Sequence, residues 1–193
     1  MKPAVHIIKV GSNIIDDEVK LNTFLSAFAQ LEGYKILVHG GGKLATELAQ
    51  DLNIPQQMLD GRRITDEATL KIVTMVYAGW INKKIVASLN GRKSPAMGLT
   101  GADGEAIIAH KRLDTTIDYG FVGDIDQVNT SLFINLLEKG LSLVVAPITQ
   151  DNNGQLLNTN ADTIAQEIAK ALSVYFNTTL IYSFEKKGVL RNA

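Results

Sequence analysis

Short, continuous apolar runs that end at glycine or at a polar cluster constrain the fold of this chain more than any other feature. Ala4–Val10, Tyr34–Val38 and Leu141–Ile148 are such runs, and apolar residues at helical spacing follow the first two. A strand without polar alternation is buried on both faces, which is typical of a parallel sheet covered by helices. The pattern therefore predicts an α/β protein, a three-layer α/β/α sandwich with a mainly parallel sheet.

The rest of the chain continues this alternation. A long helix is expected from Asp66 to about Leu89. Its middle, Ile72–Ile81, is apolar nearly all round, so it is expected to be covered either by its own sheet or by a second subunit. Further strands and helices are expected at Ala96–Leu99, Ala106–His110, Phe121–Val128, Ser131–Lys139, the residues after Asn160, and Thr178–Ser183.

Length and composition narrow the function classes. The 193 residues suit one domain, which we place at 1–193. With 19 Lys and Arg against 20 Asp and Glu, no nucleic-acid partner is expected. The absence of cysteine excludes disulfides, thiolate metal sites and thiol nucleophiles. No apolar stretch reaches the roughly 20 residues of a membrane span, and His6 and Lys9 interrupt the first run, so a cytoplasmic protein is expected.

Two groups suited to anions follow the first two predicted strands, where parallel sheets bind ligands. Lys9 is costly at the end of an apolar strand unless an anion or carboxylate meets it, and Gly11 lets a ligand approach the backbone. Gly40–Gly42 lead into a helix and would expose several N–H groups as an anion cradle. A solvated strand-end lysine and a flexible turn are the alternatives.

Polar residues later in the chain add to these groups. The Arg62–Arg63 pair suits a carboxylate or a phosphate, although one of the two, Arg62, also fits a solvated surface. In Asn158–Asp162, Asn160 is expected to cap a helix and Asp162 to orient Lys9. No nucleophile, general base or metal cluster stands out, so no protein-borne metal is expected. A site that only holds anions fits phosphoryl transfer.

These motifs resemble the amino-acid kinase family, and within it the kinases of N-acetylglutamate. The matching segments, in order and spacing, are Lys9–Gly11, His39–Lys43, Gly61–Thr65, Gly120–Gly123 and Asn158–Asp162. The resemblance implies ATP-dependent phosphorylation, with Mg²⁺ bound to ATP, of the γ-carboxylate of an N-acyl-L-glutamate. The product would be an acyl phosphate of arginine biosynthesis, and the acyl group would be acetyl or, alternatively, succinyl.

The resemblance also implies residue roles. Lys9 would stabilise the transferring phosphoryl group, and Asp162 would organise that lysine. The acyl amino acid would be held by Gly41, Gly42, Arg63 and Asn158. Gly11 and Ser12 would face phosphate, although the family usually has a second glycine in place of Ser12. The acyl pocket wall is expected from Met97–Asp103 and Tyr119–Asp124.

Family members continue beyond the length of this chain. We therefore expect residues 1–193 to form the acyl-amino-acid-binding part plus the crossover into an absent nucleotide-binding part. Such a chain is expected to bind the acyl-glutamate better than it phosphorylates it. A non-catalytic binding module, a carbamate or aspartate kinase, and a structural protein are the alternatives. A homodimer through the 66–89 helix is expected. In the family that the chain resembles, arginine inhibition goes with an extra N-terminal helix. Here the first predicted strand already begins at Ala4, so the resemblance implies no arginine inhibition.

Overall fold

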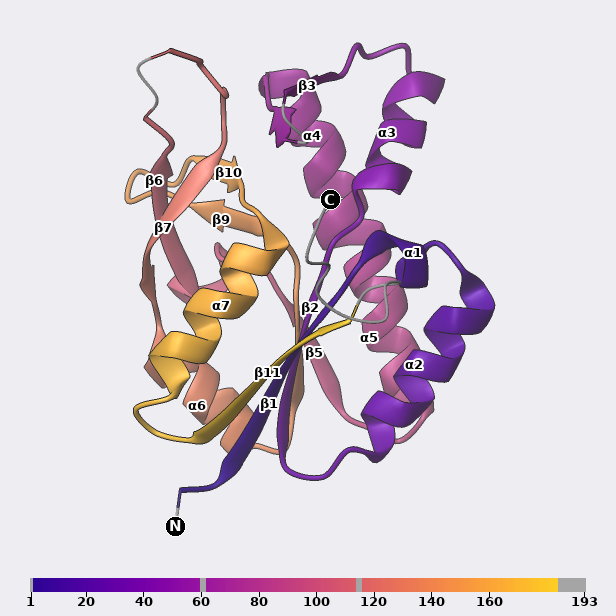
Figure 1. The fold of residues 1–193 in the computed structure, drawn as a ribbon, viewed down its shortest axis with the longest axis vertical. Coiled ribbons are helices and arrows are strands. Elements are labelled where there is room, and N and C mark those ends of the chain that lie inside the picture. Colours follow the sequence, from indigo (N-terminus) through magenta and orange to yellow (C-terminus); the bar gives the residue numbers. More distant parts are fainter. Residues whose placement is uncertain (1, 60–61, 114–115, 184–193) are drawn as a thin grey trace, which may run out of the picture.

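A five-stranded parallel sheet forms the centre of the computed structural model, which describes residues 2–59, 62–113 and 116–183 (Figure 1). The strand order is β11-β1-β2-β8-β5, and all four neighbouring pairs are parallel. The strands are β1 (Ala4–Val10), β2 (Tyr34–His39), β5 (Ala96–Leu99), β8 (Ser142–Val145) and β11 (Asn177–Ser183). Their carboxyl ends therefore share one edge.

Helices cover both faces of this sheet, which confirms the three-layer prediction (Figure 1). Helices α2 (Glu18–Gln30) and α5 (Asn82–Gly91) cover one face, and α6 (Thr130–Glu138) and α7 (Ala161–Leu172) cover the other. Alternate residues of β1 enter the two cores: Ile8 packs on the α2 side and Ile7 on the α7 side. Lys9 has the parity of Ile7, so its side chain leaves the strand towards α7.

A smaller sheet lies beyond the carboxyl edge, in the order β10-β9-β6-β7. Its strands are β6 (Ile107–Lys111), β7 (Gly123–Val128), β9 (Ile148–Gln150) and β10 (Leu156–Asn158). The prediction of one strand over Leu141–Ile148 was wrong, because β8 ends at Val145 and β9 belongs to this second sheet. Pro147 lies at the break, where it has no N–H to continue a strand ladder.

Shorter elements complete the chain, and the sequence had not indicated all of them. The antiparallel hairpin of β3 (Gln57–Leu59) and β4 (Arg62–Ile64) was missed. The other short elements are α1 (Ser12–Ile15), α3 (Gly42–Asp51) and the single turn η2 (Asp103–Glu105). Helix α3 was expected from its leucine spacing.

The predicted long helix is present as one continuous helix in three parts. It runs through α4 (Glu67–Thr74), the wider π-helical η1 (Met75–Ile81) and α5, and the Asp66 carboxylate accepts a hydrogen bond from the Thr69 N–H at 2.7 Å. Its apolar middle is buried on one side only. Met75 and Trp80 remain 52% and 64% exposed, so the sheet of this chain does not cover them.

A buried polar network joins the end of β2 to the long helix. His39 is fully buried, its Nδ1 donates to the Gly40 carbonyl at 2.9 Å, and its Nε2 accepts from Asn82 Nδ2 at 3.2 Å. This pattern requires the neutral imidazole. Burial lowers the pKa of His39 from 6.5 to about 4. Gly98 makes room for the network, since a Cβ there would lie 1.9 Å from Asn82 Oδ1.

Because His39 protonates more readily in the unfolded chain, it should make stability fall as pH drops from about 6.5 to about 4. The expected loss in the free energy of unfolding is up to about 3 kcal/mol. Urea unfolding at several pH values should show this loss in the unsubstituted chain and a much smaller one in His39→Gln. His110→Gln, at an exposed histidine paired with Asp126, is the matched control and should keep the original dependence. Equal pH dependence in all three proteins would contradict the assignment.

Candidate active site

A cavity of about 240 Å³ opens at the carboxyl edge of the main sheet. It lies where the glycine loop after β2, the β4 strand and the segment from β10 to α7 meet. Its described lining consists of Gly40, Gly41, Gly42, Met58, Arg62, Arg63, Tyr77, Arg112, Val122, Pro147, Asn158, Thr159, Asn160 and Ala161. The structure thus gathers the four predicted substrate-binding residues, Gly41, Gly42, Arg63 and Asn158, around one space.

The glycine loop packs tightly on the long helix. A Cβ on Gly41 would lie 2.3 Å from Ile81 Cδ1 and 3.0 Å from the Tyr77 ring, and both side chains are buried. Gly41 precedes α3, and no side chain caps this helix end. The first N–H groups of a helix have no partner within the helix, and α3 begins at Gly42, which lines the cavity.

Arg63 is a buried cation whose direction is fixed by its neighbours. It is 9% exposed, and its Nη2 donates to the Gly42 carbonyl at 3.0 Å and to Thr46 Oγ1 at 2.9 Å. Its Nη1 donates to Gln56. Arg62, by contrast, is exposed, as one of the two arginines was expected to be. The structure therefore holds one guanidinium rigidly in the cavity wall.

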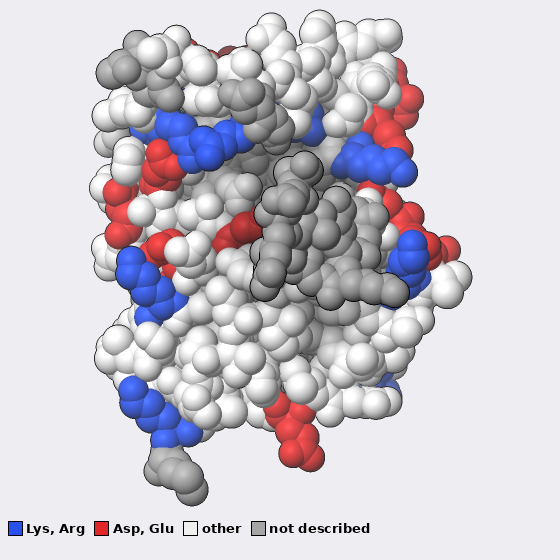
Figure 2. All heavy atoms as spheres, viewed as in Figure 1, with Lys and Arg blue, Asp and Glu red and all other residues white. Residues whose placement is uncertain are grey.

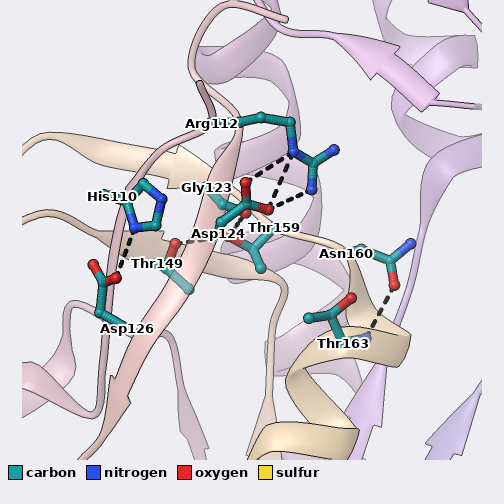
Figure 3. A network of polar contacts seen from close by, with 9 residues as sticks. All are labelled: His110, Arg112, Gly123, Asp124, Asp126, Thr149, Thr159, Asn160 and Thr163. Carbon is teal, nitrogen blue, oxygen red and sulfur yellow. Dashed lines mark hydrogen bonds and ion pairs between the residues drawn. The ribbon is translucent and has the colours of Figure 1, made fainter. Parts of the chain in front are cut away.

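Asn158 is attached to the same wall. Its Nδ2 donates to Thr65 Oγ1 at 3.0 Å, and its backbone N–H donates to the Phe121 carbonyl at 2.8 Å. The next residue, Thr159, is buried, and its hydroxyl shares a 2.8 Å hydrogen bond with Thr149 (Figure 3). These bonds fix the segment between β10 and α7 across the cavity floor.

Lys9 and Asp162 form an ion pair beside the cavity. Lys9 Nζ lies 2.8 Å from Asp162 Oδ1, and the lysine side chain is 16% exposed against 53% for the aspartate. Asn160 caps α7 as predicted, because its side chain accepts from the N–H groups of Asp162 and Thr163. Tyr182 also donates its hydroxyl to the Asp162 carbonyl at 3.3 Å. The pair itself does not line the cavity, but Asn160 and Ala161 do, so the two are adjacent.

Gly11 and Ser12 follow β1 at the same edge of the sheet, outside the cavity lining. The Gly11 N–H donates to the Ser183 carbonyl at 3.2 Å. A phosphate would compete with that bond, so Ser12 offers the better donor of the two. Gly61, at the start of one matching motif, lies outside the described residues.

Arg112 is a cavity residue that sequence reasoning missed. Its Nε lies 3.1 Å from both carboxylate oxygens of Asp124 (Figure 3). Its guanidinium also lies 5.7 Å from the Tyr119 ring centre. The Arg112 hydrogen bond is the main cause that lowers the pKa of Asp124. The signal was present as His110 and Arg112, on and directly after one strand, and Asp124 and Asp126 on the next strand, since opposite charges pair across strands.

The two segments expected to form the acyl pocket wall lie differently relative to this cavity. Val122 lines the cavity, but none of residues 97–103 does. Within the described ranges, no group of three or more histidines or carboxylates is placed to hold a metal ion. Among the same residues, no helix combines the length and apolarity needed to cross a lipid bilayer.

Comparison with known proteins decides the family. The model of the amino acid kinase family matches residues 4–192, almost the whole chain. The chain belongs to the amino acid kinase family. All five segments that carried the resemblance lie inside the match, so the expectation from the sequence is confirmed.

Individual family members show how far the similarity extends. The chain is 55% identical over 192 residues to an acetylglutamate kinase of Bacteroides fragilis, covering 100% of this chain and 74% of that protein. An acetylglutamate kinase of Cytophaga hutchinsonii is 57% identical over 189 residues, 97% of this chain and 72% of that protein. The crystal structure of smu.665 from Streptococcus mutans covers 97% of this chain and 75% of its own, with TM-score 0.80 and 24% identity, which supports the fold.

Two neighbouring glycines provide a matched test of the cavity wall. Gly41→Ala should lower the free energy of unfolding by about 1–3 kcal/mol, because the methyl group would collide with Ile81 and Tyr77. Gly40→Ala should change it by less than about 0.5 kcal/mol, because a Cβ there has no neighbour within 4 Å. Urea unfolding measures both. A neutral Gly41→Ala would show that the loop does not pack on the helix as described.

Proposed function

We propose that this protein phosphorylates the γ-carboxylate of an N-acyl-L-glutamate with ATP, as an acetylglutamate kinase of arginine biosynthesis in the cytoplasm. The observation that carries the proposal is the Lys9–Asp162 ion pair, 2.8 Å long, next to a cavity with a fixed arginine. The names of the relatives from Bacteroides fragilis and Cytophaga hutchinsonii support N-acetyl-L-glutamate as the acceptor.

The cavity suits the three groups that such an amino acid presents: its α-carboxylate, its γ-carboxylate and its acyl group. Arg63 would pair with the α-carboxylate, because its guanidinium is held in the wall and needs no ordering on binding. Asn158, which lies on β10 whereas Arg63 lies on β4, would bind the same substrate. The γ-carboxylate would then lie between the backbone of Gly41 and Gly42 and the start of α7, whose Asp162 holds Lys9.

Phosphoryl transfer to a carboxylate mainly requires that the charge on the transferring group be stabilised. A glutamate carboxylate has an ordinary pKa of about 4.3, so at neutral pH it is already the nucleophile and needs no base. Charge on the transferring phosphoryl group is stabilised by positioned cations. Lys9 would supply that cation, and Asp162 would keep its ammonium group at the cavity edge.

ATP would come as its magnesium complex, with the metal held mostly by phosphate oxygens. Ser12 and Gly11, directly after β1, would face these phosphates. We propose that residues 1–193 correspond to the acyl-amino-acid-binding part plus the crossover, since they match 74% of the Bacteroides fragilis relative. Turnover would then need contacts to the nucleotide from residues beyond the matched part. A chain without those contacts would be a non-catalytic module that binds the acyl amino acid, which is the alternative hypothesis.

We also propose that two copies of the chain associate through the long helix. Met75 and Trp80 are exposed on its π-helical part, next to a groove of about 300 Å³ that Leu44 and Leu48 of α3 also line. A contiguous apolar patch of this kind marks an association surface. A second copy of the same helix offers the matching apolar face, as a twofold interface requires.

Lys9→Met should separate catalysis from binding. Calorimetry should give an N-acetylglutamate affinity within about threefold of the unsubstituted chain, because the lysine acts on charge that develops only during transfer. Transfer, trapped as the hydroxamate with hydroxylamine in the protein that turns over, should fall at least about 100-fold. Loss of affinity equal to the loss of rate would make Lys9 a substrate anchor instead.

Arg63→Ala should chiefly weaken substrate binding, whereas Lys9→Met should chiefly slow phosphoryl transfer. It removes the charged partner of the α-carboxylate, so N-acetylglutamate affinity should fall roughly tenfold to 100-fold. Arg92→Ala, whose guanidinium bonds Ser88 and Asn22 away from the cavity, is the matched control and should keep the affinity. Unchanged affinity in Arg63→Ala would return this role to Arg62.

Trp80→Glu should convert the proposed dimer into a monomer, because a charge would be buried in the apolar contact. Sedimentation velocity measures the change. Leu113→Glu is the matched control, since Leu113 is 87% exposed far from the long helix. A monomeric unsubstituted chain, or a dimer that survives Trp80→Glu, would exclude this surface.

A further inference from the structure

Tyr77 is a cavity residue to which the proposed function assigns no part. It belongs to η1, the π-helical part of the long helix, and it is buried, with 6% of its surface exposed. It nevertheless lines the cavity at the carboxyl edge of the main sheet. π-Helical segments are rare and occur often at functional sites. A phenol in this wall can bind a ligand only through its hydroxyl group, so the neighbours of that group determine its role.

The glycine loop fixes the position of the Tyr77 ring. A Cβ on Gly41 would lie 3.0 Å from Tyr77 Cδ1 and 3.1 Å from Tyr77 Cε1, so the edge of the ring packs directly on the backbone of the loop. Ile81, four residues further along the helix, packs on the same glycine. The side chain is therefore already ordered without a ligand, and binding through its hydroxyl would cost little side-chain entropy.

Arg63 is the polar neighbour of this phenol. Its guanidinium bonds the Gly42 carbonyl and Thr46 through Nη2 and Gln56 through Nη1, which uses three of its five N–H groups. A guanidinium has no acceptor, so it can only donate towards Tyr77, and the phenol proton is left for a different acceptor. Among the described residues, no acceptor binds that proton.

Tyr77 keeps its proton at neutral pH. Burial raises the pKa of Tyr77, and the positive charge of Arg63 opposes that rise only in part. Buried tyrosine hydroxyls usually have a hydrogen-bond partner, so a donor that faces a cavity without one indicates an acceptor on a ligand. The carboxyl edge of the main sheet lies in the upper part of Figure 1, and Figure 2 shows a band of lysine and arginine side chains across the upper part of the same view. Such a surface attracts an anionic acceptor.

We infer that the Tyr77 hydroxyl donates a hydrogen bond to the same carboxylate that Arg63 binds, which makes Tyr77 a further substrate-binding residue. This inference rests on the proposed function, because it takes that anion as the α-carboxylate of the acyl-glutamate. The carboxylate then receives an O–H donor from the long helix and N–H donors from β4. Hydrogen bonds to an ionised acceptor are roughly twice as strong as those between neutral groups.

Two ligands and the variant Tyr77→Phe test the inference on the chain as it is. N-acetyl-L-glutamate has the α-carboxylate, and N-acetyl-γ-aminobutyrate is the same molecule with a hydrogen atom in its place. Tyr77→Phe removes the hydroxyl and keeps the ring that packs on Gly41. We expect the variant to bind N-acetyl-L-glutamate roughly tenfold more weakly, and N-acetyl-γ-aminobutyrate with an affinity within about twofold of the unsubstituted chain. Titrations followed by amide chemical shifts measure both affinities, including weak ones.

Tyr34→Phe is the matched control. Tyr34 lines the separate hollow at the opposite end of the sheet, where its ring packs edge-on against Phe176, so its loss of a hydroxyl should leave both affinities unchanged. Thermal unfolding confirms that each variant is folded. If Tyr77→Phe weakens the binding of both ligands equally, the hydroxyl only supports the wall of the cavity, and the inference is overturned.

The remaining outcomes separate this inference from the proposed function. If Tyr77→Phe binds N-acetyl-L-glutamate as tightly as the unsubstituted chain while Arg63→Ala does not, the inference is overturned and the proposed function stands. If the unsubstituted chain binds neither ligand, both are overturned together, because the cavity is then not an acyl-glutamate site.

Discussion

Parallel pairing of the central strands is the constraint on which the site depends. β1 pairs with β2 and β11, and β2 pairs with β8, all in the same direction. Segments distant in the chain therefore end at one edge: Lys9, the loop Gly40–Gly42 and the segment after Val145. No local interaction brings these groups together. The ion pair of Lys9 with Asp162 exists because α7 packs on the face of the sheet towards which Lys9 points.

The site is rigid because its polar groups are bonded before any ligand arrives. Arg63 is tied to Gly42 and Thr46, Asn158 to Thr65, and the start of α7 to Asn160. Ordering these groups on binding would cost side-chain entropy, and the fold has already met that cost. The glycine loop is fixed in the same way by its close contact with the long helix.

Much of the fold could be predicted from the sequence because its strands are buried on both faces. β1 and β2 are mostly apolar and lack regular polar alternation, and α2 has regular helical spacing, so local pattern and global burial agree. The break after Val145 was missed, since an apolar run continues across Pro147 although the chain changes sheet there. The β3–β4 hairpin was missed as well, because its strands have three residues each and no alternation long enough to detect.

Some site residues could likewise be predicted from the sequence, and others could not. Three glycines in a row are costly in backbone entropy, and a lysine in an apolar strand is costly to desolvate, so Lys9 and Gly40–Gly42 could be named in advance. Arg112 could not, because its importance depends on how β6 and β7 pair and on where Asp124 then lies. The surroundings of the long helix were left open for a similar reason, since an apolar face does not say what covers it.

Amide chemical shifts of the chain on addition of N-acetyl-L-glutamate would test most directly where the ligand binds. The account predicts that the largest changes occur at Gly40, Gly41 and Gly42 and at Asn158–Ala161, which line the cavity at the carboxyl edge. Gly33 and Gly140 line a separate hollow at the opposite end of the sheet and should not change. Changes confined to those two glycines, or none at the glycine loop, would contradict the account.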